Sequence, residues 1–490
     1  MLLNTNAQDI LGMLAKFFDS SPSEAFIVGG FVRDSFLNIP SRDIDIATTQ
    51  NPEVIGPQIA KLIGGKSFVL NPEQHITRIS YKDDTGHKWD IDLSHITNSI
   101  TENLSQRDFT INGMAIPIAQ YDEQNWSDIV VDPQNGLTDL FNNTLRCMNK
   151  HVFEQDGLRL LRGVRLAHKL NLRIEPVTAN NMRASSKSIE LVSAERLRDE
   201  FLYIMSSKAT RSQLEILDRL DVLCRIIPEL THTKGVDQPN VHYWDVWGHS
   251  IHAVETAELA TSGHHNSAIY SLVPWTEEIE SHFDEVVSDG HNRKTILKLT
   301  ALLHDIAKPQ TKTTDEFGKT RFLGHSEQGA EIATQRLLSL RMSANGARMI
   351  NKMIEQHLRP TNMSHGNELP TPRAIYRYYR DLKDVAIDTL YLAIADYLAA
   401  KGPEVMPDDW SRHARMVSHI LQTGSEQKTL NKPNRLITGK DLIREFQLIP
   451  GPQIGDLLDK IYESQAAGEI KTPEDALSLA AQYLSNNKQG

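Results

Sequence analysis

Cysteine and long apolar runs are both scarce in this chain of 490 residues. Its two cysteines, Cys147 and Cys224, are too few for a disulfide framework or a cysteine-based zinc site, which favours a reducing compartment such as the cytoplasm. No run approaches eighteen consecutive apolar residues, so we expect no membrane-spanning helix. The N-terminal residues lack a basic start followed by an apolar core, so we expect no signal peptide.

The chain also lacks an excess of basic residues. Lys and Arg number 52 against 63 Asp and Glu, a formal net charge of -11, which on average argues against a nucleic-acid partner because phosphates bind to basic faces. The charge is uneven, however. Residues 146–225 hold 15 Lys and Arg against 10 Asp and Glu, a net +5 that leaves -16 for the rest. Any polyanionic partner is therefore expected along this middle stretch.

Two kinds of periodicity divide the chain. Residues 1–19 have the apolar spacing of an amphipathic helix, and short strand-like runs separated by turn residues follow. From Phe153 onward helical spacing dominates. The pattern predicts an α+β protein with a mixed head of about 145 residues and then a long all-α region. The expected strands are Ala25–Val28, Ile44–Ala47, Ser67–Leu70, Ile76–Tyr81, Trp89–Leu93 and Gly113–Ile118.

The most informative pattern is Gly29-Gly30-Phe31-Val32-Arg33-Asp34, followed by Asp43-Ile44-Asp45. Two glycines after a strand let backbone amides approach a phosphate group. Residues i and i+2 of a strand share a face, so Asp43 and Asp45 present two carboxylates together, a donor set that suits Mg²⁺. A later strand offers a third carboxylate, Asp92 or its same-face neighbour Asp90. The pattern favours two-metal phosphoryl transfer.

These motifs resemble the signature of the tRNA nucleotidyltransferase and bacterial poly(A) polymerase family, a branch of the polymerase-β-type nucleotidyltransferases. Four further segments resemble that family in the same order along the chain. Two positions depart from its pattern, because Gln106 and Gln155 stand where the family has Arg and Glu. The four segments are Arg107-Asp108-Phe109-Thr110-Ile111-Asn112, Asp132 to Leu140, Gln155-Asp156-Gly157-Leu158-Arg159, and Glu195-Arg196-Leu197.

The resemblance implies a role for each matching residue. Asp43 and Asp45, with Asp92, would be the catalytic carboxylates, and Asp156 and Arg159 would read the incoming base as a protein template. A carboxylate can accept from the exocyclic amine of adenine or cytosine, while a guanidinium donates to a ring nitrogen or carbonyl. Asp156 and Arg159 are spaced i, i+3, so on one helix both side chains would face the same way. The other implied nucleotide contacts are Gly29, Gly30, Arg33, Arg107, Asp108, Asn112, Arg162 and Arg165.

Basic residues recur at helical spacing after this motif. Arg159, Arg162, Arg165, Lys169 and Arg173 are spaced to line one side of a helix, which by itself usually means a solvated face. The family resemblance implies that such neck and body helices contact the nucleotide and the tRNA acceptor stem, through phosphate contacts that ignore sequence.

A second constellation of histidines lies in the helical region. His304-Asp305 ends an apolar helix and leads into Ile306-Ala307-Lys308-Pro309, a pattern that resembles the HD superfamily of metal phosphohydrolases. His249, His304, Asp305 and Asp396 match the four metal ligands of that family, and the ion would be a divalent transition metal or Mg²⁺. His325 and His357 resemble the additional histidines of its two-metal members.

The resemblances imply a protein that adds or repairs the 3′-terminal CCA of tRNA from CTP and ATP. They predict a polymerase-β-like head at residues 1–145, a neck and body at 146–235, an HD-type domain at 236–410 and a helical tail at 411–490. Addition of CC, of A or of poly(A) stays open within the family. HD phosphohydrolysis as the main activity, or an RNA-binding scaffold without catalysis, are the alternatives of a different class.

Overall fold

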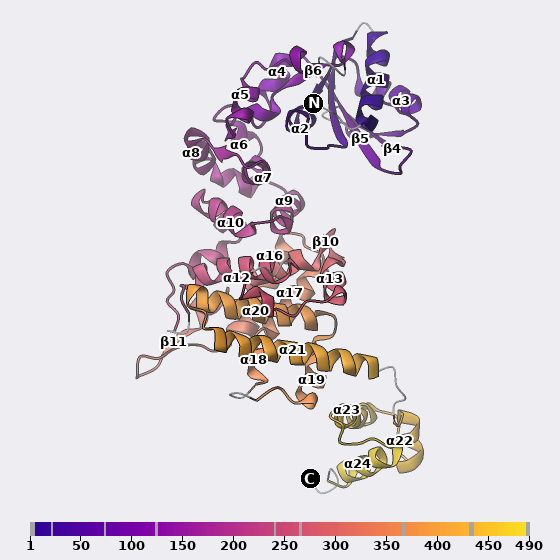
Figure 1. Cartoon of the computed structure of the whole chain (residues 1–490), viewed down its shortest axis with the longest axis vertical. Coiled ribbons are helices and arrows are strands. Elements are labelled where there is room, and N and C mark those ends of the chain that lie inside the picture. Colours follow the sequence, from indigo (N-terminus) through magenta and orange to yellow (C-terminus); the bar gives the residue numbers. More distant parts are fainter. Residues whose placement is uncertain are drawn as a thin grey trace. The chain divides into compact units, whose positions relative to one another are not determined.

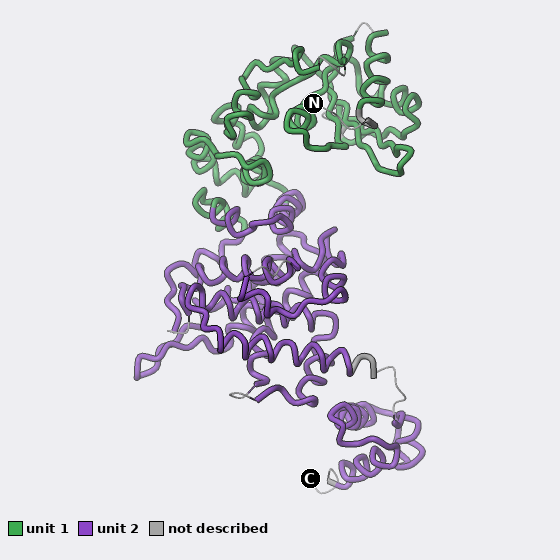
Figure 2. Tube along the Cα trace, in the orientation of Figure 1, with its two compact units in different colours: residues 1–193, 216–226 green, residues 194–215, 227–490 purple. Residues whose placement is uncertain are grey.

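The structure is a computed structural model that describes residues 5–20, 23–72, 75–122, 126–239, 242–263, 267–364, 368–430 and 436–486. It divides into two compact units, and each is described by itself (Figure 2). Unit 1 comprises residues 1–193 and 216–226, and unit 2 comprises residues 194–215 and 227–490. No helix among the described residues is long and apolar enough to cross a membrane.

Unit 1 begins with helix α1 (Thr5–Asp19) and contains a six-stranded sheet in the order β3-β4-β5-β2-β1-β6 (Figure 1). Strands β2 and β5 pair in parallel, and the other neighbouring strands pair antiparallel. All six strands predicted from the sequence are confirmed. Their bounds are β1 Ala25–Val28, β2 Asp43–Thr48, β3 Lys66–Asn71, β4 Ile76–Lys82, β5 Lys88–His95 and β6 Ala115–Pro117.

Alternation along the strands separates a covered face of this sheet from an open one. Trp89, Ile91 and Leu93 of β5 are fully buried, whereas Asp90 and Asp92 between them are partly exposed. Helix α3 (Pro52–Ile63) lies on the covered face, where its Gly56 backbone approaches the Thr77 side chain of β4. Apolar residues with a period of two therefore place every carboxylate of β2 and β5 on the open face.

The remainder of unit 1 is mainly helical. Helix α2 (Gly30–Phe36) follows β1 directly, and the segment that carries Arg107 leads into the short helix η1 (Thr110–Asn112). A small parallel pair, β7 (Thr144–Leu145) and β8 (Arg173–Ile174), interrupts the predicted all-α region. The other elements are α4 Ile100–Ser105, η2 Ile118–Gln120, η3 Trp126–Ile129, α5 Gly136–Phe141, α6 Val152–Gln155, α7 Leu158–Lys169, α8 Pro176–Ala184, η4 Ser186–Leu191 and α11 Leu223–Ile226.

Unit 2 is helical around α14 (Arg293–Leu303), all of whose residues except Lys294 are buried. Two hairpins, β9–β10 and β11–β12, are added to the predicted helices. Helix α10 (Thr210–Arg219) crosses the boundary between the units. The other elements are α9 Ala194–Ser206, η5 Pro228–Thr233, α12 Val246–Ala260, η6 Tyr270–Leu272, α13 Glu277–Asp284, β9 Val286–Ser288, β10 His291–Asn292, α15 Lys308–Thr311, β11 Lys312–Thr314, β12 Thr320–Phe322, α16 His325–Ser339, α17 Ala344–Gln356, α18 Arg359–Asn362, α19 Pro372–Leu382, η7 Lys383–Val385, α20 Ala386–Lys401, η8 Gly402–Glu404 and α21 Pro407–Leu430.

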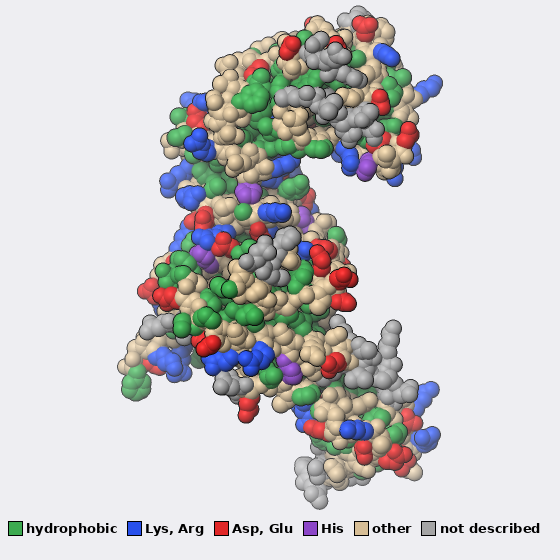
Figure 3. Space-filling model, viewed as in Figure 1, with side chains coloured by type: hydrophobic (Ala, Val, Ile, Leu, Met, Phe, Trp, Pro, Cys, Tyr) green, Lys and Arg blue, Asp and Glu red, His purple; other side chains and the backbone are tan. Residues whose placement is uncertain are grey.

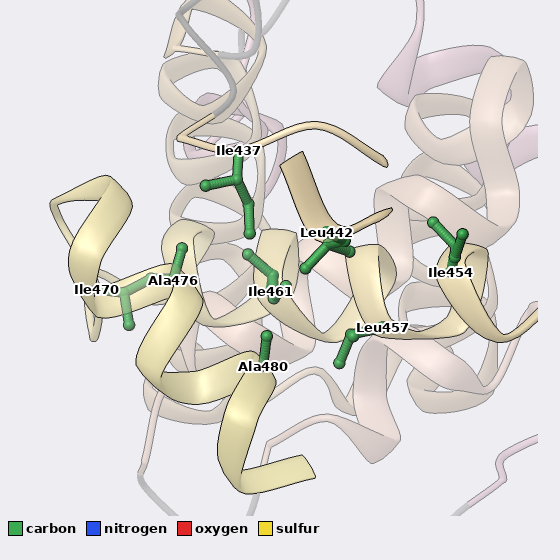
Figure 4. Close-up of a cluster of buried hydrophobic side chains, with 8 residues drawn as sticks. All are labelled: Ile437, Leu442, Ile454, Leu457, Ile461, Ile470, Ala476 and Ala480. Carbon is green, nitrogen blue, oxygen red and sulfur yellow. The ribbon is translucent and has the colours of Figure 1, made fainter. Parts of the chain in front are cut away.

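The C-terminal segment of unit 2 has a small apolar core of its own (Figure 4). It is built from α22 (Gly439–Phe446), α23 (Pro452–Ala466) and α24 (Pro473–Asn486). Leu442 and Ile461 are completely buried there. Glu463 of α23 forms ion pairs with Arg373 and Arg377 of α19, which tie this core to the rest of unit 2.

Candidate active site and metal centre

Two adjacent strands bring four carboxylates together on the open face of the sheet. Asp43 and Asp45 stand on the same face of β2, as their spacing predicts. The parallel register sets Asp43 opposite Asp90 and Asp45 opposite Asp92. The pair of carboxylates read from the sequence is thus part of a square of four.

Arg78 of β4 distinguishes the two candidates for the third carboxylate. Its Nε and Nη2 donate to the two oxygens of Asp92 at 2.7 and 2.6 Å. Asp90 instead accepts from Lys88 Nζ at 2.8 Å, and Arg78 Nη1 lies 3.9 Å from it. Asp92 is therefore the carboxylate beside Asp45, but a guanidinium already shares its charge, which the sequence reading did not anticipate.

Burial and mutual repulsion raise the pKa values of the β2 carboxyls. Burial raises the pKa of Asp45 to about 6, with Arg107 opposing it and Asp43 and Asp92 adding to it. Burial and the neighbouring Asp92 also raise the pKa of Asp43. Carboxylates that repel one another at neutral pH are the donor set that a divalent cation relieves, so the residues present fit Mg²⁺.

Gly29 lies between the carboxylates and the basic segment. Its φ of +77° and ψ of −141° belong to a region open almost only to glycine. A Cβ there would lie 2.6 Å from Arg107 Nη1 and 2.7 Å from Asp45 Oδ2. Glycine is required here both by conformation and by space, and the backbone comes into direct reach of the site.

Arg33 is held in a buried network at the start of α2. Its Nε donates to Asp34 Oδ1 at 2.8 Å, and its Nη1 donates to Asn112 Oδ1 at 2.5 Å. Asn112 Nδ2 in turn donates to Asp108 Oδ1 at 2.8 Å. Arg162 Nη2 of α7 lies 3.2 Å from the other oxygen of Asp108. Residues from three separate motifs thus form one polar wall beside the carboxylates.

Arg107 completes that wall as a cation with spare hydrogen-bonding capacity. Burial lowers its pKa, while the carboxylates of Asp45 and Asp108 oppose the shift. Its Nε is buried and has no hydrogen-bond partner within the part of the chain that the structure describes, and the same holds for Nε of Arg162. Guanidinium groups with an unpartnered Nε beside the Gly29 turn indicate an anionic ligand.

The pair expected to read the base is arranged differently from the prediction. Asp156 and Arg159 were expected on one helix, but Asp156 has extended backbone and precedes α7, whose amide at Leu158 donates to it at 3.1 Å. The short helix α6 ends before Asp156, because the Asp156 side chain competes for backbone amides. Arg159, in the first turn of α7, donates to Gln155 Oε1 at 3.1 Å and to the Gln106 carbonyl at 3.1 Å.

The basic side of α7 is shorter than predicted. Arg159, Arg162 and Arg165 are partly exposed on it, but the helix ends at Lys169 and Arg173 lies in β8. The break follows from Asn171, whose φ of +52° ends the helical path. Figure 3 shows Lys and Arg side chains over the α7–α8 part of unit 1 on the face in view.

In unit 2, residues far apart in sequence converge on one buried centre. His249 Nε2 of α12 lies 3.1 Å from His304 Nε2 and 3.1 Å from Asp396 Oδ1 of α20. Asp305 Oδ2 lies 3.3 Å from His249 Nε2 and 3.2 Å from His304 Nε2. All four predicted ligands of the HD pattern therefore meet.

The two additional histidines lie on the other side of Asp305. His325 Nε2 is 3.4 Å from Asp305 Oδ1 and 3.4 Å from His357 Nε2. Two groups have donor atoms within 4.8 Å of one another, His249 with His304 and Asp396, and His304 with Asp305 and His357. Asp305 presents Oδ2 to His249 and His304 and Oδ1 to His325, so its carboxylate would suit a divalent metal on either side.

Backbone carbonyls orient the histidine rings of this centre. Nδ1 of His304, His325 and His357 donates to the carbonyls of Ala301, Phe322 and Ile354, at 2.9, 2.7 and 2.6 Å. Each Nε2 therefore faces the centre as a metal-binding atom. Burial lowers the pKa of His357 to about 4, which keeps that ring neutral. The residues present fit a divalent metal.

Two further residues at this centre were missed from the sequence. Lys308 Nζ lies 2.6 Å from Asp305 Oδ2 and donates to Gln238 Oε1, also at 2.6 Å. Burial and the Lys308 charge lower the pKa of His242 to about 4. Both line a cavity of about 620 Å³ beside the ligands. Lys308 could have been identified from the sequence, because it follows Asp305 by one helical turn. No sequence pattern pointed to His242.

Four family models match successive parts of the chain. They are the poly(A) polymerase head domain at residues 25–146, a probable RNA- and SrmB-binding site of polymerase A at 171–233, the HD domain at 249–401 and a tRNA nucleotidyltransferase domain 2 at 412–481. With the geometry above, they define a nucleotidyltransferase head joined to an HD-type helical region.

Similar proteins cover nearly the whole chain. A Deinococcus radiodurans A-adding tRNA nucleotidyltransferase is 26% identical over 94% of this chain and 96% of its own, and a Thermus thermophilus CC-adding one is 28% identical over 93% of each. A solved CCA-adding enzyme in complex with ATP has a TM-score of 0.67 at 21% identity, over 98% of this chain and 96% of its own. The chain therefore combines a poly(A) polymerase head domain with an HD domain and is similar over nearly its whole length to tRNA nucleotidyltransferases.

Proposed function

We propose that this protein adds or repairs the 3′-terminal CCA of tRNA, using CTP and ATP and no nucleic-acid template. The observation that carries the proposal is the square of four carboxylates beside Gly29 and the Arg33–Asn112 network, in a chain similar to tRNA nucleotidyltransferases. Residues 1–145 would be the catalytic head, 146–235 the neck and body, 236–410 the HD-type domain and 411–490 the tail. Its free cysteines suit the cytoplasm.

Asp43 and Asp45, with Asp92 beside them, would hold Mg²⁺. When bound, the ion lowers the charge at the reacting phosphate and favours ionisation of a 3′-hydroxyl. The Gly29 backbone lies close enough to the carboxylates to contact the triphosphate, and the free Nε groups of Arg107 and Arg162 offer donors to its oxygens. The buried hydrogen bonds of Arg33 fix its guanidinium before the nucleotide arrives, which reduces the entropy lost on binding.

Asp156 and Arg159 would select the base. Asp156 is held by the Leu158 amide at the N-terminus of α7, and Arg159 is held by Gln155 and the Gln106 carbonyl. All three contacts are to groups of the chain itself, so the two side chains are positioned without a nucleic-acid strand. A carboxylate and a guanidinium in fixed places can accept from the exocyclic amine and donate to the ring of either cytosine or adenine.

Addition of CC alone or of A alone is the second candidate. It is favoured by the names of four relatives that match the chain over more than nine-tenths of its length, one A-adding and three CC-adding. The three outcomes separate in one assay, in which the protein is incubated with tRNAs that end before the CCA, after C or after CC, and with CTP, ATP or both. We expect ordered addition of C, C and A that then stops. Long A tails would indicate a poly(A) polymerase, and no extension of any tRNA would remove the proposal.

We infer that the HD-type centre is a second, phosphohydrolytic site. Its support is the convergence of six ligating side chains beside the cavity that also contains Lys308. A divalent transition metal or Mg²⁺ at this centre would supply a hydroxide nucleophile near neutral pH. Lys308 is placed to attract a phosphate oxygen. Burial lowers the pKa of His304, but Asp305 and Asp396 outweigh that effect and raise it to about 10. A protonated His304 would therefore hold those two carboxylates together in the metal-free centre.

A further inference from the structure

The open face of the head sheet continues past the carboxylates to the edge strand β3. Strand register places Asp45, Asp92, Arg78 and Phe68 side by side, one from each of four adjacent strands. Paired residues point to the same face of a sheet, so Phe68 shares the face of the catalytic carboxylates. Three strand spacings of about 4.8 Å place it roughly 14 Å from Asp45.

Exposure rises along this row. Asp92 has 19% of its side chain exposed and Arg78 has 28%, whereas Phe68 at the edge is 48% exposed. Lys66, two residues before Phe68 on the same face, is also exposed and lies in the row of Ser80, Asp90 and Asp43. An exposed aromatic ring next to basic side chains is the combination that binds single-stranded nucleic acid.

The chemistry of the head indicates which substrate reaches this side. In an in-line transfer the attacking oxygen and the leaving pyrophosphate lie on opposite sides of the α-phosphorus. The candidate triphosphate contacts, Gly29 and Arg33, follow β1, which lies on the side of β2 away from β5. A triphosphate held on the β1 side would leave the side of β5, β4 and β3 for the attacking 3′-hydroxyl.

We propose that Phe68, Lys66 and Arg78 form a platform for the single-stranded 3′ end of the RNA that is extended. Phe68 stacks on a base upstream of the reacting nucleotide, and Lys66 contacts the phosphate backbone. Arg78 links the platform to the active site, because its guanidinium holds Asp92 while its strand position is paired with Phe68. This inference rests on the proposed function, since it needs an RNA substrate with an unpaired 3′ end.

The matched control is one residue away. Val69 of β3 is 45% exposed, close to the 48% of Phe68, but alternation points it to the opposite face, in register with Thr77. The experiment measures binding of the full chain to two tRNAs, one ending in CC and one lacking all unpaired 3′ nucleotides, for the wild type and for Phe68→Ala, Phe68→Tyr and Val69→Ala. Circular dichroism checks that each variant is folded.

Phe68→Ala is expected to weaken binding of the CC-ended tRNA roughly tenfold, the loss typical of one stacked base, and to leave the shortened tRNA unchanged. Phe68→Tyr and Val69→Ala are expected to bind both RNAs like the wild type. Equal affinities of Phe68→Ala and wild type for the CC-ended tRNA, or an equal loss for both RNAs, would overturn the platform. If wild type extends no tRNA, the proposed function fails; if it extends tRNA while Phe68→Ala binds normally, only the platform fails.

Discussion

The two candidate sites are built in opposite ways. The head site takes its carboxylates from the neighbouring strands β2 and β5, and partly exposed oxygen ligands repel one another there. The HD-type site takes histidines and aspartates from segments that are distant in sequence. Most of these side chains are buried, and backbone carbonyls orient three of the histidines. The proposed transfer needs an open face for two large substrates and a hard cation, whereas a buried histidine centre is suited to a tightly held divalent metal.

The largest expected effect separates the two sites. Asp45→Asn should reduce nucleotide addition to tRNA about a thousandfold, because it removes a ligand that supplies several kcal/mol of transition-state stabilisation. A His304→Ala, Asp305→Ala double variant should instead lose metal-dependent hydrolysis of bis(p-nitrophenyl) phosphate. Primer extension and hydrolysis assays on both variants provide the measurement.

In this test each variant serves as the control for the other, and each should keep the activity of the opposite site within about twofold. Hydrolysis that disappears in Asp45→Asn, or that is missing from the parent protein, would contradict an independent HD-type activity. Nucleotide addition that survives in Asp45→Asn would contradict the assigned carboxylates.

The second effect concerns the Gly29 turn of the head site, where the backbone lies close to the Arg107 and Asp45 side chains. Gly29→Ala places a Cβ within 2.7 Å of Arg107 and Asp45 at a backbone conformation that alanine avoids, so we expect roughly a hundredfold loss of kcat/KM for nucleotide addition. Gly64→Ala is the matched control, because Gly64 also has positive φ, +74°, but its Cβ would meet nothing within 4 Å. Equal activities of the two variants would show that the glycine turn does not shape the site.

The smallest expected effect is on stability. Because burial raises the pKa of Asp45 from 3.8 to about 6, the folded head binds that proton more tightly than the unfolded chain does. The contribution of Asp45 to the free energy of unfolding is therefore fully present below about pH 4 and is lost as the pH rises through about 6. The loss amounts to roughly 1–3 kcal/mol.

Asp45→Asn, measured in a chelator at pH 8, should accordingly have a Tm about 4 °C above that of wild type, and the difference should shrink on acidification to pH 5 or on addition of Mg²⁺. His304→Ala is a useful comparison, because it removes a partner from buried Asp305 and Asp396 and should lower the Tm instead. A Tm for Asp45→Asn that is below wild type at pH 8 would contradict the repulsion described for the head.

Local sequence determined the elements and part of each site. Short strand-like runs bounded by turn residues predicted six strands of the head. The i, i+2 spacing of Asp43 and Asp45 places both on one face of their strand whatever the rest of the chain does. Periodicity predicted the ends of α7 wrongly, because a single polar side chain or a turn ends a helix. Asp156 precedes α7, and Arg173 lies beyond its end.

Only the tertiary structure decided which groups meet. Strand register sets Asp92 opposite Asp45 and brings Arg78 to it, and packing of α12, α14, α17 and α20 gathers the histidines. The physical reason is that backbone periodicity acts over a few residues, whereas register and helix packing depend on side-chain contacts across the chain. The net charge of -11 could not show this either, because binding responds to the charge at a surface and not to the average.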